Sequence, residues 1–246
     1  MRNFFQPMNM RYVKFVQGIL YSKIRKLLFW AFSDFMIRRS WLKRGKNYIN
    51  EGISDTYRLM YDMLANLCLK EKPKKILEYG CGYGYLLNEI FLKNSDNLNI
   101  EYVGIDYSPI QIEKAKKFFK GGNFFVYDLT KGIHQFKDGE FDIVVGVDVL
   151  MYIQPALINN AISNLFKICK NKLFLVEYYY KYLSDKKKED YREAHFSDGR
   201  CIYDYAELLT KHGFKKINTV PIEFFTDKMI NIQDEMAQTL VIAEKE

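Results

Sequence analysis

The 246-residue chain is short of the residues that build metal sites and disulfide frameworks. It has four cysteines, none of which forms a CxxC pair, and only three histidines. This composition predicts neither a structural zinc site nor disulfides, and is typical of a reducing, cytoplasmic setting. Long apolar runs are also lacking in the first 50 residues, where Leu27–Phe32 is far short of the roughly 20 residues of a membrane-spanning helix. No secretory signal is expected, because Arg11 and Lys14 interrupt the first apolar stretch.

Acidic residues are almost absent from residues 1–50, where eleven Lys or Arg accompany a single acid, Asp34. That stretch carries +10, so the remaining residues carry −3 of the total of +7. Eleven aromatic residues are interspersed, and apolar positions recur at helical spacing. We predict a basic, aromatic-rich helical arm or lid over residues 1–70. Its partner could be an anionic membrane at the inner face, a phosphorylated or lipid-linked sugar or, less favoured, nucleic acid. A lid with a merely solvated basic face is the alternative.

From residue 71 to 246 the sequence alternates between apolar runs and amphipathic stretches. We expect strands at 75–79, 102–105, 124–127, 143–147 and 173–177, and helices near 84–93, 109–119, 155–168 and 203–212. Two closing strands are expected in FKKINTVPIEFF and TLVIAEKE, with a loop over 226–237, and an earlier helix begins after an N-cap at Ser54. This order predicts an α/β domain with a doubly wound, seven-stranded, mostly parallel sheet.

The stretch ILEYGCGYGYLL, residues 76–87, places glycines at 80, 82 and 84 directly after the first expected strand. Glycine permits positive φ and a close approach of the backbone to a ligand. In parallel sheets, ligands bind beyond the carboxyl ends of the strands, and Asp106 and Asp128 follow the next two strands. A dinucleotide fingerprint, GxGxxG, would have a third glycine where this chain has Tyr85, so pyrophosphate binding is disfavoured.

This loop, together with YVGIDYSPIQIEKAKK and FDIVVGVDVLMYI, resembles the class I S-adenosylmethionine (SAM)-dependent methyltransferases. The resemblance implies that Gly80, Gly82 and Glu78 lie near the methionine part of the cofactor, and that Asp106 holds the ribose hydroxyls. The other cofactor contacts that it implies come from the rest of the loop and from the following strand ends: Cys81, Gly84, Tyr107, Asp128, Leu129 and Val147.

Methyl transfer needs an aligned nucleophile and, for a hydroxyl acceptor, a base. His195 and Asp148 are the two candidate bases, because both follow strands at the ligand-binding edge. Tyr152, Glu177 and Tyr178 are candidate substrate contacts. No metal is expected, because the positions that bind one in some quinone-biosynthetic relatives hold Asp148, Met151 and Tyr152 here.

The acceptor follows mainly by elimination. The fourth strand is followed by Val147-Asp148-Val149-Leu150, which is neither the Asn/Asp-Pro-Pro-aromatic motif of amino-methylating enzymes nor a loop with a cysteine nucleophile. We therefore expect O-methylation of a small molecule or of a glycan or lipid-linked intermediate. Three alternatives remain open: an RNA or protein methyltransferase, a short-chain reductase using NAD(P) through Tyr182 and Lys186, and a catalytically silent partner protein with this fold.

Overall fold

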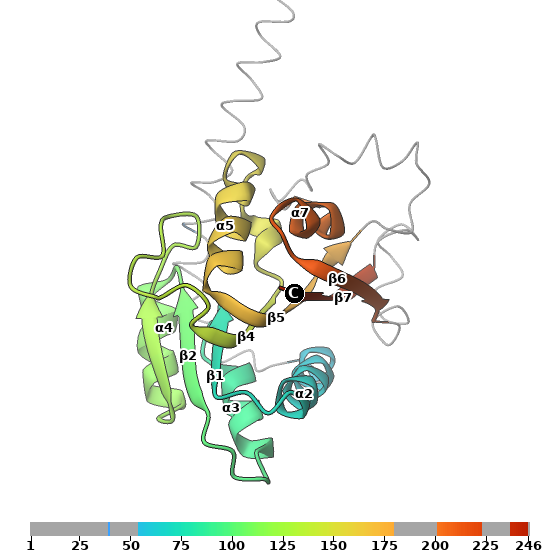
Figure 1. Ribbon diagram of the computed structural model, residues 1–246. Coiled ribbons are helices and arrows are strands. Elements are labelled where there is room, and N and C mark those ends of the chain that lie inside the picture. Colours follow the sequence, from blue (N-terminus) through green and yellow to red (C-terminus); the bar gives the residue numbers. More distant parts are fainter. Residues whose placement is uncertain (1–38, 40–53, 180–200, 223–236, 246) are drawn as a thin grey trace, which may run out of the picture.

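The computed structural model describes residue 39 and residues 54–179, 201–222 and 237–245 (Figure 1). These residues form a seven-stranded sheet of order β3-β2-β1-β4-β5-β7-β6, in which β7 runs antiparallel to β5 and β6. The strands are β1 Lys75–Tyr79, β2 Glu101–Asp106, β3 Gly122–Val126, β4 Phe141–Val147, β5 Cys169–Tyr179, β6 Lys215–Pro221 and β7 Ala237–Glu244. The predicted α/β class and mostly parallel sheet are confirmed.

Helices cover both faces of the sheet (Figure 1). They are α2 Asp55–Lys70, α3 Tyr85–Lys93, α4 Pro109–Phe118, the 3-10 helix η1 Leu150–Tyr152, α5 Pro155–Ile168 and α7 Tyr205–Lys211. Buried side chains of α2, α3 and α4 share one hydrophobic cluster, and those of α5 and α7 share the other. Because α2 contributes to the first cluster, residues 55–70 pack as part of the domain. The division at residue 70 stays a prediction, and residues 1–38 and 40–53 of the arm lie outside the described part.

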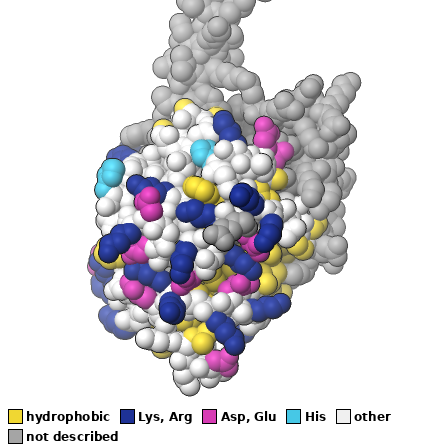
Figure 2. Space-filling view, viewed as in Figure 1, with side chains coloured by type: hydrophobic (Ala, Val, Ile, Leu, Met, Phe, Trp, Pro, Cys, Tyr) yellow, Lys and Arg dark blue, Asp and Glu magenta, His cyan; other side chains and the backbone are white. Residues whose placement is uncertain are grey.

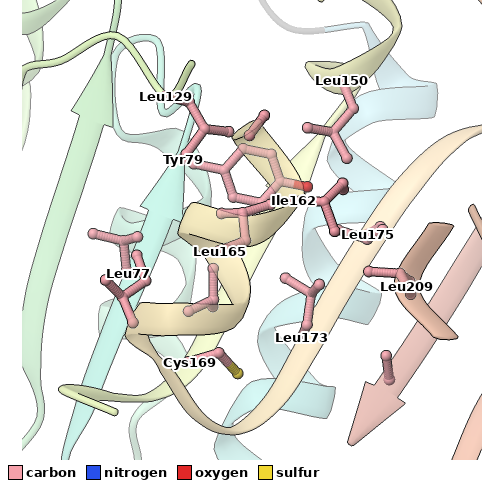
Figure 3. Packing of buried hydrophobic residues seen from close by; sticks show 14 of the residues in the cluster. Leu77, Tyr79, Leu129, Leu150, Ile162, Leu165, Cys169, Leu173, Leu175 and Leu209 are labelled. Carbon is pink, nitrogen blue, oxygen red and sulfur yellow. The ribbon is translucent and has the colours of Figure 1, made fainter. Parts of the chain in front are cut away.

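The two clusters follow from the alternation of side chains along each strand. In β5, Leu173 and Leu175 point to one face, whereas Phe174 and Val176 point to the other. Figure 3 shows the first of these pairs with the residues of α5 and α7 that cover them. A strand buried on both faces reads as a continuous apolar run, which explains why the sequence predicts these central strands well.

Several strand bounds differ from the predicted ones, and β3 and β5 illustrate why. β3 begins at Gly122 and ends at Val126, whereas the pattern predicted residues 124–127. Glycine is disfavoured in strands, but a Cβ at Gly122 would lie 2.9 Å from the Phe124 ring, so the packing requires it. Tyr127 instead leaves the strand, and its N–H donates to the Asp106 carbonyl at 2.8 Å. β5 is longer than predicted at both ends, because residues Lys172–Tyr179 pair with β7 and Cys169 pairs with Phe141 of β4.

Charged side chains of both signs are interspersed on one face of the molecule. Figure 2 shows Lys and Arg side chains next to acidic ones on the face around the end of the chain, and not as one continuous basic patch. Lys75 pairs with Glu101 and Glu140, and Lys172 pairs with Glu71 and Glu244. Within the described ranges, no helix is both long and apolar enough to cross a membrane.

Candidate functional site

A cleft of about 420 Å³ opens at the carboxyl ends of the parallel strands. The glycine loop after β1 and the ends of β2 and β4 form one part of its wall, and side chains from α2 and η1 form another. Ten of the residues predicted from the sequence line it: Gly80, Cys81, Gly82, Asp106, Tyr107, Asp128, Leu129, Val147, Asp148 and Tyr152. Residues spread over 73 positions of sequence are thus brought to one site by the parallel topology.

The three glycines of the loop serve different purposes. A Cβ at Gly80 would lie 2.2 Å from a methyl carbon of Val149, and one at Gly84, the N-cap of α3, would lie 2.7 Å from the Phe124 ring. Gly82 has φ of +51° and nothing within 4 Å of the Cβ position. The missing side chain at Gly82 therefore leaves open space in the cleft, which is where a ligand can approach the backbone.

Asp106 ties the glycine loop to the start of α4. Its two oxygens accept from the Gly82 N–H at 3.0 Å and from the Ser108 N–H at 2.8 Å. Burial raises the pKa of Asp106, and the two N–H donors oppose that effect. Each carboxylate oxygen has a second lone pair, so the group can also accept from ligand hydroxyls. The neighbouring Tyr107 ring is 38% exposed at the mouth of the cleft.

The end of β3 supplies the opposite wall of this part of the cleft. Asp128 accepts from the Thr130 N–H at 3.0 Å and from its hydroxyl at 2.6 Å, so the carboxylate stabilises its own turn. Leu129 is buried in the core cluster while also lining the cleft, and Figure 3 shows it beside Tyr79. Asp106 and Asp128 thus both bring carboxylate acceptors to the lining of the cleft.

Asp148 is held at the other part of the cleft by two distant elements. Its Oδ2 accepts from the Tyr57 hydroxyl of α2 at 2.6 Å and from the Gln238 amide of β7 at 2.5 Å. Its φ is +53°, an uncommon conformation for a residue with a side chain, and its N–H donates to Val176 at 2.8 Å. Strained backbone of this kind gathers at functional sites, where the surrounding structure enforces it.

Glu177, predicted as a substrate contact, lies beneath the loop that follows β4 and does not line the cleft. Its carboxyl accepts from the N–H groups of Val149 at 2.9 Å, Leu150 at 2.7 Å and Met151 at 3.4 Å. Burial, followed by the charge of Asp148, raises its pKa to about 8. Glu177 therefore positions the loop that follows β4, because its carboxyl accepts from the backbone N–H groups at the start of η1.

Three further predicted residues are also not among those lining the cleft. Gly84 serves the packing of α3, as described above. Glu78 is buried; its carboxyl accepts from the Leu87 N–H of α3, and burial raises its pKa well above the usual value. Tyr178 is buried in β5. A contact of these residues with cofactor or substrate stays a prediction. His195 lies outside the described residues.

Some lining residues escape the sequence patterns. The hydroxyl of Tyr57 donates to Asp148 Oδ2, but nothing in the spacing of Tyr57 along its helix singles it out. Tyr61 lies one helical turn further along and also lines the cleft. The i, i+4 spacing of the two tyrosines is therefore the pattern that could have indicated a shared face toward the cleft. Gln238, 90 positions from Asp148, had no signal. In the described part of the chain, no group of three His, Cys, Asp or Glu side chains is placed to hold a metal ion.

A doubly wound sheet of this order, with a glycine loop after β1 and acids at the ends of β2 and β4, defines the class I methyltransferases. The family model for a methyltransferase domain matches residues 53–219, more than half of the chain. The chain therefore belongs to this family of methyltransferase domains. The predicted fold, enzyme class and cofactor, those of a class I SAM-dependent methyltransferase, are confirmed at this level.

Individual proteins resemble the chain less closely. A non-reducing polyketide synthase of Penicillium brasilianum, ausA, is 33% identical over 106 residues, which are 40% of this chain and 4% of the synthase. The CurJ carbon methyltransferase has a TM-score of 0.60 at 15% identity, over 91% of this chain and 70% of CurJ. The trans-methyltransferase CalH, solved in complex with S-adenosylhomocysteine (SAH), has a TM-score of 0.51 at 18% identity, over 75% of this chain and 54% of CalH. At these identities the two structures show the shared fold.

Proposed function

We propose that this protein transfers the methyl group of SAM to a hydroxyl of a small-molecule acceptor, with Asp148 as the base that meets the acceptor. The observation that carries the proposal is the carboxylate of Asp148, fixed on the cleft wall by Tyr57 and Gln238. Tyr57 and Gln238 are neutral donors that fix the direction of the carboxylate. A carboxylate so oriented can take the proton of a bound hydroxyl.

The residues present fit the cofactor. Open space at Gly82 admits a ligand against the backbone, and Asp106 and Asp128 present acceptors to the donors of an adenosine. Gly80, Cys81 and Gly82 would hold the methionine part, Asp106 the ribose and Tyr107 with Leu129 the adenine, while Val147 would border the sulfur. When bound, SAM supplies an activated methyl group on a positively charged sulfur. The chain itself aligns the acceptor and removes its proton, for which His195 remains the other candidate.

A second candidate acceptor atom is carbon. The names of two similar proteins favour it, since one is a polyketide synthase and the other a carbon methyltransferase. An acidic C–H group also needs a base at the position of Asp148, so the described geometry serves both acceptors. A glycan or lipid-linked acceptor held by residues 1–50, and a site of action at the inner membrane face, stay predictions.

The test is methyl transfer from isotopically labelled SAM to a fractionated cell extract. We expect one fraction to gain the mass of one methylene group, and the NMR shift of the labelled methyl to distinguish oxygen from carbon. Asp148→Asn should lower this transfer strongly while binding SAH as the wild type does. Asp138→Asn, which removes an exposed carboxylate paired with Lys167, is the control and should transfer normally. Binding of SAH without transfer to any fraction would contradict the proposal and favour the silent partner protein.

A further inference from the structure

The segment that follows β4 brings three side chains to the cleft. Asp148 and Val149 come directly after the strand, and Tyr152 belongs to η1. Val149 also lies against the glycine loop, since a Cβ at Gly80 would be 2.2 Å from one of its methyl carbons. The path of this segment therefore sets where Asp148 stands relative to the glycine loop.

One side chain of β5, that of Glu177, holds three successive backbone N–H groups of the segment. Its Oε1 accepts from the N–H groups of Val149 at 2.9 Å and Leu150 at 2.7 Å. Its Oε2 accepts from the N–H group of Met151 at 3.4 Å. The first N–H groups of a helix have no partner within it, and η1 spans only three residues. The segment therefore depends on Glu177 for its place.

The end of β5 also holds the backbone of Asp148 itself. The Asp148 N–H donates to the carbonyl of Val176 at 2.8 Å, and Val176 directly precedes Glu177. Between these two anchors Asp148 has its φ of +53°. A conformation of this kind persists only where the surrounding structure enforces it. We therefore expect the backbone of Asp148 to relax when the contacts of Glu177 are loosened.

Glu177 acts from beneath the cleft. Its side chain is buried and is not among those that line the cleft, so it does not touch a bound ligand. The groups around it are the carboxylate of Asp148 and the hydroxyls of Tyr79, Tyr203 and Tyr205, the last at 3.5 Å. With its pKa raised to about 8, the carboxyl is neutral at neutral pH. It therefore holds the segment without placing a second negative charge beside Asp148.

The glycine loop has anchors of its own. The Cys81 N–H donates to the Ile105 carbonyl at 3.0 Å, and the Gly82 N–H donates to Asp106 at 3.0 Å. Neither hydrogen bond involves Glu177. A change at Glu177 should therefore displace Asp148 and leave the cofactor part of the cleft intact.

We propose that Glu177 is a positioning residue for methyl transfer, which acts through Asp148 by fixing the backbone that carries it. The inference rests on the proposed function, because it takes Asp148 as the base. It gives a buried carboxyl group at the end of β5 an effect on turnover that is separate from cofactor binding.

The first experiment compares two conservative variants of the full chain. Glu177→Asp keeps the carboxyl and shortens the side chain, so the oxygens withdraw from the N–H groups. Glu177→Gln keeps the length and an oxygen that accepts from Val149 and Leu150. Transfer of labelled methyl from SAM to the accepting extract fraction should fall at least about tenfold in Glu177→Asp, because small misplacements at a reacting centre are costly. Most of the transfer should remain in Glu177→Gln.

Calorimetry should show that both variants bind SAH as the wild type does. Wild-type transfer in Glu177→Asp would overturn the inference, because the position of the carboxyl would then not matter. Equal losses of transfer in the two variants would overturn it as well, and so would weakened binding of SAH in Glu177→Asp.

Asp142→Ala is the matched control. Asp142 also accepts from two backbone N–H groups, those of Lys74 at 2.8 Å and Lys75 at 3.1 Å, but it lies at the end of β4 away from the cleft. This variant should lose stability in urea unfolding and transfer methyl as the wild type does. A loss of transfer as large as that in Glu177→Asp would overturn the inference, because general destabilisation would then explain both.

A double-mutant cycle tests whether Glu177 acts through Asp148. In the Asp148→Asn background, Glu177→Asp should lower the residual transfer no further, since the group that it positions is already changed. A further loss as large as that in the wild-type background would overturn the inference. Wild-type transfer in Asp148→Asn alone would instead refute the proposed function.

An NMR measurement independent of turnover covers the case in which Glu177→Asp does not fold. In the wild type, the backbone amide signals of Val149 and Leu150 should shift as Glu177 loses its proton near pH 8. The same signals should not shift in Glu177→Gln. Amide signals that do not respond to pH in the wild type, or respond equally in both proteins, would overturn the inference and leave the proposed function intact.

Discussion

At the scale of single residues, two neighbouring carboxyl groups of this site have different tasks. Glu177 is fully buried, and its pKa of about 8 means that it holds a proton at neutral pH. Asp148 directly follows β4, and its carboxylate is fixed by the hydroxyl of Tyr57 and the amide of Gln238. Here Glu177 supports the backbone, and Asp148 faces the cleft.

The raised pKa of Glu177 predicts a pH dependence of stability. Because the folded-state pKa of about 8 exceeds the ordinary 4.5, the folded protein binds the extra proton between these values. The contribution of Glu177 is therefore fully present below pH 4.5 and is lost as pH rises to about 8, by at most about 1.4 kcal/mol per pH unit. Glu177→Gln should flatten this decline, as measured by urea unfolding across the window.

Glu113→Gln is the matched control, because Glu113 is an exposed carboxylate paired with Lys117. Its pKa is lowered, chiefly by the hydrogen bond from Lys117, so this variant should retain the decline of the wild type. Parallel declines in Glu177→Gln and in the wild type would show that Glu177 does not hold the extra proton.

At the residue scale, the sequence predicts the acids that follow strands and misses their partners. Asp106, Asp128 and Asp148 could be found because each stands directly after an apolar run, and the topology then brings strand ends together. Glu177 stands at such an end as well, but its side chain turns under the η1 loop, a direction that spacing does not reveal. Gln238 could not be found, because its pairing with Asp148 depends on the register of β7 against β5.

Among the elements, the glycine loop contains one position that is needed for packing and another that leaves room for a ligand. Gly82 and Gly84 both have positive φ, at +51° and +75°. A side chain at Gly82 would meet open space, whereas one at Gly84 would meet the Phe124 ring at 2.7 Å. Of these two positions, Gly84 is constrained by the packing against β3, whereas the space at Gly82 is available to the cofactor that we propose to bind there.

Alanine substitutions should expose this difference. Gly82→Ala should cost about 1–2 kcal/mol of stability from the left-handed backbone and should bind SAH much more weakly, because its methyl group occupies the space of the ligand. Gly84→Ala should destabilise the protein more, because the Phe124 ring must also move. Thermal unfolding with and without SAH measures both effects. Full stabilisation of Gly82→Ala by SAH would show that the ligand does not approach this backbone.

The helices, and β1 among the strands, were the elements that the sequence predicted best. The helix Asp55–Lys70 follows Ser54, whose hydroxyl accepts from the Tyr57 N–H at 3.4 Å, as the N-cap pattern implies. β3 was shifted, because it lies at the edge of the sheet and its Gly122 is there for packing. Local signals thus give the elements, whereas tertiary packing decides their ends.

At the scale of the whole molecule, the cleft joins the common α/β core to elements at both ends of the chain. Strands β1 to β4 carry the residues that we assign to the cofactor, while α2 and β7 hold Asp148. The sequence predicts the cofactor residues because the motifs that carry them follow one another in the expected order. It cannot predict the contacts that hold Asp148, since residues about 90 positions apart in the sequence leave no local pattern.

The central claim is that this cleft binds SAM through the glycine loop and Asp106. Calorimetric titration of the full chain with SAH tests it most directly. We expect saturable binding of one SAH per chain, weakened by at least about tenfold in Asp106→Asn, because charge-assisted hydrogen bonds to the ribose are lost. NADPH should not bind. Absence of SAH binding, saturable binding of NADPH in its place, or an unchanged affinity in Asp106→Asn would contradict the account.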